Sequence, residues 1–227
     1  GRIGVMFFYC TYILGDMRLM APVMLAFQIG SMAGQFIFPP FALKLGKSRM
    51  LIISAIISGC LLLAIFLFGD TSMPVLYALQ FLYGLAGFAA PITLAMIPDA
   101  VDHYELKHGI RADGTSYATV SLSTKIASAF GGAVSLYIMG FFGYDGAAKV
   151  QTAEAMTGIN VAANLVPAVL AFVAAIFMFF WKLNTKRMEE ISAELDIKRA
   201  AQADALAHGL SREEAEAAAA AAAESVL

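Results

Sequence analysis

Lys125 is the residue whose type and position most clearly indicate chemistry. It lies about ten residues into an apolar run at residues 115–142. A lysine near the centre of a bilayer costs about 2.5–3.5 kcal/mol on insertion scales, so it needs a partner or a water-filled cavity. Helical spacing places other polar and small residues on or beside its face: Tyr117, Ser121, Thr124, Ser128 and Gly132. We interpret this stripe as the lining of a polar path; the alternative is a lysine that extends to the membrane interface.

A charged loop at residues 99–114 is the second candidate. One interpretation is a gate, whose ion pairs hold two parts of a helical bundle together in one state and release them in another. A second is metal binding through Asp99, Asp102 and the histidines, although this sequence holds no second acidic cluster for a dinuclear site. A third is a solvated loop. The loop contains Asp99, Asp102, His103, Glu105, Lys107, His108, Arg111 and Asp113.

Other polar residues in the apolar runs are expected to form hydrogen bonds between helices. They are Gln28, Gln35, Gln80, Asn160 and Asn164. The segment Gly46-Lys47-Ser48 is not a phosphate loop, because Phe41 stands where that motif requires glycine. No nucleophile–histidine arrangement is present in the sequence, so we assign no catalytic residue and no metal ligand.

The composition is that of a membrane protein. Of the 227 residues, 60% are hydrophobic and 14% are charged, with a mean hydropathy of +0.74. Soluble domains carry about 25% charged residues, and disordered chains are poor in apolar residues. A mildly acidic tail beside an apolar body gives no indication of nucleic-acid binding. Cys10 and Cys60 lie in apolar runs, so we expect buried thiols and no disulfide.

Six apolar runs predict an all-α polytopic protein. The runs fall at about residues 1–15, 20–43, 50–68, 74–98, 115–142 and 159–181, all within residues 1–184. The last five are long enough to span a bilayer as helices. The first is short and lacks a signal-peptide pattern, so we expect a truncated helix and a missing upstream segment. If that helix extends upstream, Arg2 lies within it and could face a cavity.

Basic residues in the loops predict the orientation. Loops after the second, fourth and sixth runs carry most of the Lys and Arg residues, whereas the opposite loops carry Arg18 and Lys149. By the positive-inside rule the first set and the C-terminus face the cytoplasm. The basic set is Lys44, Lys47, Arg49, Lys107, Arg111, Lys182, Lys186 and Arg187.

Small residues and a proline predict details of packing. The pairs Gly30/Gly34 and Ser128/Gly132 have the spacing of close helix contacts. Pro91 is expected to kink the fourth span.

Residues 185–227 are expected to form a cytoplasmic helical tail. Met188, Ile191 and Leu195 share one helical face. The alanine-rich end, which includes Ala217–Ala223, predicts a frayed helix or an inert solvated tail.

The loop and the lysine together resemble the glycoside–pentoside–hexuronide:cation symporter family, within the major facilitator superfamily. The resemblance rests on the order Asp99, Asp102, Glu105, Gly109, Arg111, then Gly114-Thr-Ser-Tyr117, then Lys125. The tail segment at residues 186–195 is similar to the usual family ending, and the resemblance covers roughly residues 1–199. Two positions depart from the pattern. Ala90 stands where an aromatic sugar contact is found in the family, and Leu43 stands where the superfamily loop signature has Asp.

The resemblance implies the C-terminal six-helix half of a twelve-helix fold, with the first helix truncated. It implies symport of a sugar or glycoside with Na⁺ or H⁺ by alternating access, with no other cofactor. The cation site would lie mainly on the N-terminal half, which would be a partner together with the bilayer of the inner membrane. Lys125 would lie beside that site and Ser121 and Thr124 near the sugar. The gating positions would be Asp99, Asp102, Glu105 and Arg111.

Two alternatives stay open from the residues alone. One is a membrane-embedded lipid or prenyl transferase that uses Asp99 and Asp102 with Mg²⁺. The other is a membrane assembly subunit that does not transport.

Overall fold

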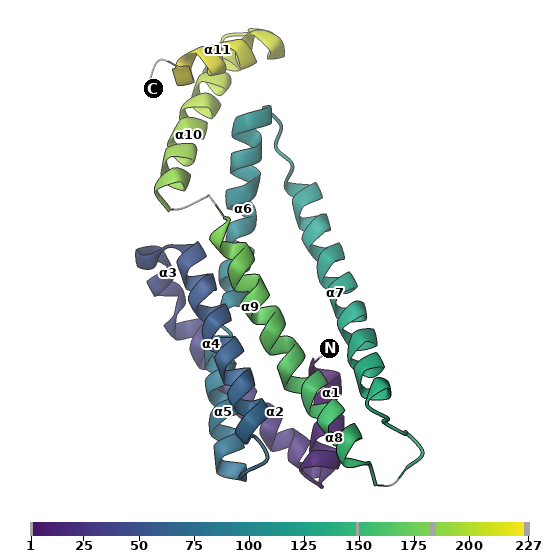
Figure 1. Ribbon diagram of the computed structural model, residues 1–227. Coiled ribbons are helices and arrows are strands. Elements are labelled where there is room, and N and C mark those ends of the chain that lie inside the picture. Colours follow the sequence, from purple (N-terminus) through teal and green to yellow (C-terminus); the bar gives the residue numbers. More distant parts are fainter. Residues whose placement is uncertain (1, 149, 182–184, 225–227) are drawn as a thin grey trace. The chain divides into compact units, whose positions relative to one another are not determined.

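The computed structural model describes residues 2–148, 150–181 and 185–224, and throughout these ranges the regular structure is helical (Figure 1). Lys149 and Lys182, two of the loop cations used for the orientation, lie outside the described residues. The chain forms two compact units. Unit 1 comprises residues 1–94 and 119–182, and unit 2 comprises residues 95–118 and 183–227.

Unit 1 contains most of the apolar helices. They are α1 (Arg2–Phe8), α2 (Met20–Ile37), α3 (Pro39–Leu45), α4 (Lys47–Phe68), α5 (Met73–Ala86), α8 (Ala153–Asn160) and α9 (Val166–Phe179). Short segments join some of them: the π-helices η1 (Tyr9–Ile13) and η3 (Val161–Leu165), and the 3₁₀ turn η2 (Met17–Leu19). Two helices belong to both units: α6 (Ala89–His108) and α7 (Asp113–Phe141).

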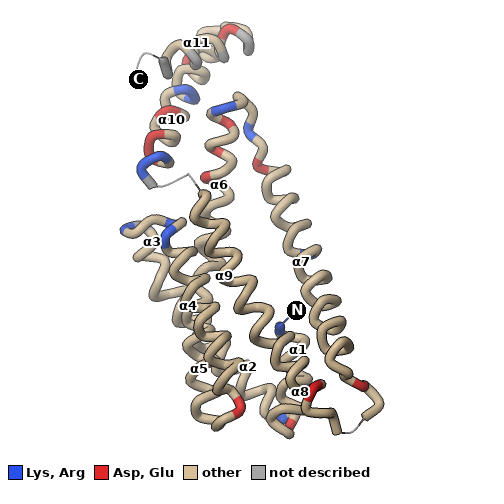
Figure 2. The backbone as a smooth tube through the Cα atoms, viewed as in Figure 1, with Lys and Arg blue, Asp and Glu red and all other residues tan. Residues whose placement is uncertain are grey.

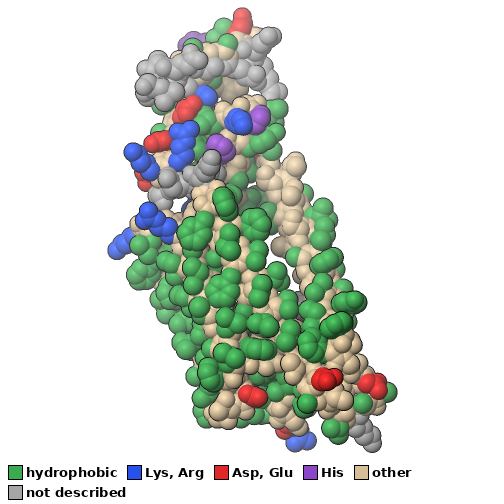
Figure 3. Space-filling model, in the orientation of Figure 1, with side chains coloured by type: hydrophobic (Ala, Val, Ile, Leu, Met, Phe, Trp, Pro, Cys, Tyr) green, Lys and Arg blue, Asp and Glu red, His purple; other side chains and the backbone are tan. Residues whose placement is uncertain are grey.

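Five helical segments are long and apolar enough to cross a membrane, by length and composition. These candidate spans are Met17–Ile37, Lys47–Phe68, Met73–His108, Asp113–Phe141 and Ala153–Phe179. They agree with the last five predicted runs, and the shorter apolar helix Arg2–Ile13 agrees with the first. Hydrophobic side chains cover the visible face of unit 1, and most of its charged residues lie near the ends of its helices, whereas Lys125 lies midway along α7 (Figures 2 and 3). The polytopic all-α class is therefore confirmed.

Helices α2 and α5 pack at backbone contact, as the Gly30/Gly34 spacing predicted. A Cβ atom on Gly30 would overlap the carbonyl oxygen of Phe81, and one on Gly34 would overlap that of Leu85. The contact is reciprocal, since a Cβ on Gly84 would overlap the carbonyl of Phe27. Glycine is therefore required for this approach.

Other contacts complete the core of unit 1. Gly59 of α4 accommodates the ring of Phe172 on α9, and Ser54 Oγ donates to the carbonyl of Ala86 at 2.6 Å. The buried cluster at the α1–η1 end includes Met6, Tyr9 and Cys10. Cys10 is buried as expected, but Cys60 is exposed, and both thiols are free.

The helix break predicted for Pro91 is present, since the fourth apolar run is interrupted at Gly87–Phe88, in the turn before this proline. The proline inside α6 is Pro98. In α7, a Cβ on Gly132 would meet nothing within 4 Å among the described atoms. The Ser128/Gly132 spacing therefore makes no close helix contact here.

Unit 2 combines the ends of α6 and α7 with the tail helices α10 (Thr185–Ala207) and α11 (Arg212–Glu224). Ile191 and Leu195 of the predicted apolar face are buried. The alanine-rich helix begins at a reciprocal cap between Ser211 and Glu214, whose backbone N–H groups bond each other's side chains. Ala215 of α11 is buried, and α11 packs on α10 (Figure 1). The tail therefore forms a packed helical pair.

Candidate functional site

A charged cluster of Asp102, Glu105, Arg111 and Arg199 lies within unit 2. Arg199 of α10 binds the Glu105 carboxylate through both Nε and Nη2, at 3.2 and 2.7 Å. Its Nη2 also donates to Asp102 Oδ1 at 3.2 Å. Arg111 Nη1 donates to the same two carboxylates, at 3.1 Å to Glu105 and 3.3 Å to Asp102. Two carboxylates one helical turn apart therefore hold two guanidinium groups.

The loop after α6 gives Arg111 its place in the cluster. Gly109 ends α6 with φ +70°, a left-handed conformation that glycine adopts without strain. Arg111 then pairs with Asp113 at the start of α7 as well. These contacts raise the pKa of Arg111, chiefly through the hydrogen bond to Asp113. The bond to Glu105 raises the pKa of Arg199.

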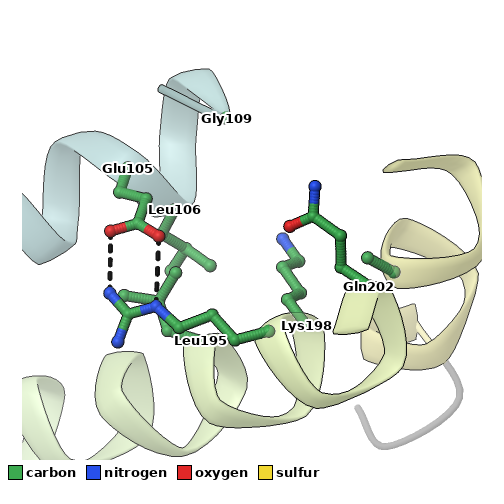
Figure 4. A pocket seen from close by; sticks show the side chains of 8 residues that line it. Glu105, Leu106, Gly109, Leu195, Lys198 and Gln202 are labelled. Atoms are coloured by element: carbon green, nitrogen blue, oxygen red, sulfur yellow. Dashed lines mark hydrogen bonds and ion pairs between the residues drawn. The ribbon is translucent and has the colours of Figure 1, made fainter. Parts of the chain in front are cut away.

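Arg199 was missed in the sequence, although a signal was present. It lies one helical turn after Leu195, so it continues the face of Ile191 and Leu195 toward α6. A small cavity of about 180 Å³ lies beside the cluster, with Leu106, Leu195, Lys198 and Gln202 in its lining (Figure 4).

The segment at residues 99–114, predicted as a loop, is helical up to the end of α6 at His108. Its remaining acidic and histidine side chains do not form a metal centre in the described part of the chain. No group of three or more His, Cys, Asp or Glu side chains comes together there. His108 stacks on Tyr104 with ring centroids 4.4 Å apart. Asp99 and His103 lie on α6, and His103 Nδ1 is buried. The magnesium alternative therefore receives no support from the geometry.

Lys125 lies on the part of α7 that belongs to unit 1. Ten consecutive positions, residues 121–130, are exposed. By the helical rise of 1.5 Å, Lys125 is about 18 Å from Asp113 and about 24 Å from Phe141. Lys125 thus lies close to the middle of a bilayer core about 30 Å thick.

The predicted stripe around Lys125 is on the exposed surface of α7. Tyr117, Ser121, Thr124 and Ser128 are exposed, and Thr124 Oγ1 donates to the carbonyl of Ser121 at 2.8 Å. Within the described ranges, no hydrogen bond or ion pair involves the Lys125 ammonium. Placing the Lys125 ammonium inside a bilayer is unfavourable without a polar or charged partner. The side chains that the structure describes do not supply this partner.

A second polar group, the Arg2 cluster, lies inside unit 1 and includes two of the predicted polar residues. Arg2 Nη2 donates to Gln80 Oε1 and to Asn164 Oδ1, both at 3.3 Å, and Arg2 Nε donates to the carbonyl of Ala163 at 3.1 Å. The guanidinium carbon lies 4.6 Å from the centroid of the Tyr83 ring. Gln80 and Asn164 are fully buried.

A relay of amides continues from this cluster. Asn164 Nδ2 donates to Asn160 Oδ1 at 2.8 Å, and Asn160 Nδ2 donates to the carbonyl of Phe66 at 3.0 Å. The relay connects η3, α8 and α4, as expected for polar residues between helices. Gln35 is different, because it bonds Ser31 on its own helix at 3.0 Å. Sequence spacing could not show that Arg2 joins these amides.

Comparisons with known proteins identify the family. Residues 1–185 match the family described as MFS/sugar transport protein. The chain belongs to this family. The resemblance seen in the loop and in Lys125 is therefore confirmed, and the major facilitator fold with it.

Several curated relatives are transporters by name. The glucuronide carrier protein homolog of Escherichia coli K12 is 30% identical over 86% of this chain and 43% of its own length. The putative glycoside/cation symporter YagG of the same strain is 34% identical over 63% of this chain and 32% of its own. The putative sulfoquinovose importer of Salmonella typhimurium LT2 is 30% identical over 86% and 41%. The chain thus spans less than half the length of these relatives.

Proposed function

We propose that this chain is the C-terminal part of a sugar symporter of the inner membrane that is coupled to Na⁺ or H⁺. The observation that carries the proposal is Lys125, an exposed lysine midway along a spanning helix of a sugar transport family. Transporters of this class bind substrate near the bilayer midplane, between two halves. The relatives named as a glycoside/cation symporter and a sulfoquinovose importer support the same class.

The partner of Lys125 in this proposal is a carboxylate on an N-terminal six-helix segment. Na⁺ or H⁺ bound to that carboxylate would compete with the ammonium group. Sugar binding beside Lys125, near Ser121 and Thr124, would then favour one conformation when the cation is bound. Coupling follows from this differential binding between conformations.

The charged cluster serves as a cytoplasmic gate in the same proposal, with the C-terminus inside. Asp102, Glu105 and Arg111, predicted as gating residues, are joined there by Arg199. Asp99, the fourth gating residue, lies one turn before Asp102 on α6. We propose no enzymatic activity for this chain.

Uptake by the whole transporter tests the proposal. Lys125→Ala should abolish sugar uptake driven by a Na⁺ or H⁺ gradient in membrane vesicles, while the amount of inserted protein stays unchanged. Lys186→Ala, at an exposed lysine of the tail, is the matched control and should transport normally. Wild-type uptake by Lys125→Ala would refute the role of Lys125. Absence of gradient-driven uptake of any sugar by the wild type would refute the function.

A further inference from the structure

The Arg2 cluster holds a positive charge inside unit 1 without a negative partner. The groups that contact the guanidinium are the two amide oxygens, the Ala163 carbonyl and the Tyr83 ring, and all are neutral. No Asp or Glu in residues 2–148, 150–181 or 185–224 forms an ion pair with Arg2. A charge withdrawn from water without a counter-charge is unfavourable, and in a membrane it indicates a functional site.

Hydrogen-bond donors are left over in this cluster. Nε and Nη2 of Arg2 are occupied, whereas Nη1 has no hydrogen-bond partner among the residues that the structure describes. Gln80 Nε2 is buried and also lacks a partner there. The buried Gln80 donor is unfavourable without an acceptor. A guanidinium group and an amide N–H group together match the two oxygens of a carboxylate or sulfonate.

The donors are held in place before any ligand binds. The amide relay fixes Asn164 with its oxygen toward Arg2, since its nitrogen donates to Asn160. The π-helix η3 supplies the Ala163 carbonyl, and π-helical turns are frequent at functional sites. Arg2 lies about 17 Å from Ile13 along the helix axis, near the middle of a bilayer.

We propose that Arg2 and Gln80 bind the acidic group, a carboxylate or sulfonate, of the transported sugar. This assignment rests on the proposed function for the sugar, but the binding of an oxyanion at Arg2 can be measured without transport. An oxyanion could also come from an Asp or Glu side chain of the protein outside the described residues. The experiment separates these two sources.

Gln80→Glu is the sharpest variant. It keeps the shape of the side chain, replaces the unpartnered NH₂ group with an oxygen, and gives Arg2 an internal negative partner. The probes are p-nitrophenyl β-glucuronide and p-nitrophenyl β-glucoside, which differ in a carboxylate or CH₂OH group at C6. Binding is measured as ligand-dependent thermal stabilisation of the purified whole transporter. We expect the wild type to prefer the glucuronide.

The expected effect follows from the loss of charge-assisted hydrogen bonds. Gln80→Glu and Arg2→Gln should each weaken glucuronide binding by about 10- to 100-fold, and change glucoside binding less than about threefold. Gln35→Glu is the matched control, because Gln35 is exposed and bonds only its own helix in the described structure. Its binding should equal that of the wild type.

Three results would overturn the assignment. They are equal binding of both probes by the wild type, no binding of either probe, and equal weakening of both probes by Arg2→Gln. The last result would mean that a carboxylate of the protein neutralises Arg2. The assignment is supported if the wild type prefers the glucuronide and Gln80→Glu abolishes this preference. That result would support it even if no Na⁺ or H⁺ gradient drives sugar uptake by the wild type. In that case the proposed function fails and the oxyanion site stands.

Discussion

The bond between Arg199 and Glu105 should tether the tail helix α10 to the end of α6 with a measurable coupling energy. The two residues form a bidentate pair, with contacts of 2.7 and 3.2 Å. The Glu105 side chain is 15% exposed and that of Arg199 is 42% exposed. Exposed pairs contribute about 0.2–1 kcal/mol, and bidentate geometry with partial burial places this pair near the upper end. We therefore expect about 1 kcal/mol, or roughly a fivefold change in the opening equilibrium of α10.

A double-mutant cycle with Arg199→Met, Glu105→Gln and both changes together isolates this energy. Hydrogen exchange of the α10 amides reports the opening equilibrium directly. Each single variant should speed exchange, and the second change should add little to the first. High salt should reduce the coupling, because the pair is partly exposed.

Lys198→Met is the matched control for this cycle. Lys198 is the neighbouring cation on α10, and its ion pair is with Glu194 of the same helix, at 3.3 Å. It should therefore show no coupling with Glu105→Gln. Additive effects of Arg199→Met and Glu105→Gln, with a coupling energy below about 0.3 kcal/mol, would refute the tether.

Three further predictions concern unit 1. Gly30→Ala should destabilise the protein by about 1–3 kcal/mol in thermal unfolding, because its Cβ overlaps a backbone carbonyl of α5. Gly132→Ala, in open space, should change the stability by less than about 0.5 kcal/mol, and equal effects would contradict this packing. Asn164→Ala should destabilise by about 1–3 kcal/mol, since it leaves buried partners of the relay unpaired; a neutral result would argue against the relay. Burial, together with a hydrogen bond to Tyr12, raises the pKa of Tyr144 to about 12. Its stabilising contribution should therefore be complete below pH ~10 and be lost as the pH rises toward 12, which ultraviolet titration checks against Tyr144→Phe.

The helical spans could be predicted from the sequence because hydrophobic length alone determines them. The exact ends and breaks could not. Pro91 was expected to kink a helix, and the helix does break in the turn before it, at Gly87–Phe88. The packing at this break was not predicted: Phe88 is buried and stacks on Phe38 with centroids 4.4 Å apart. Tertiary packing of this kind leaves no periodic trace in the sequence.

The candidate site could be predicted where its residues are close in the chain. Asp102, Glu105 and Arg111 lie within one helix and its loop, so their spacing showed that they could meet. Arg199 is 94 positions from Glu105, and Arg2 is 78 positions from Gln80. Only the fold brings such residues together, and a single sequence holds no record of that proximity.

The amide relay runs in one direction, and this determines how it responds to pH. Arg2 donates to Asn164, Asn164 to Asn160, and Asn160 to the carbonyl of Phe66. The charge of Arg2 polarises the aligned amide dipoles, and the relay links η3, α8 and α4. Amides do not titrate and arginine stays protonated at any physiological pH. The hydrogen bonds of the relay therefore keep the same strength as the pH changes.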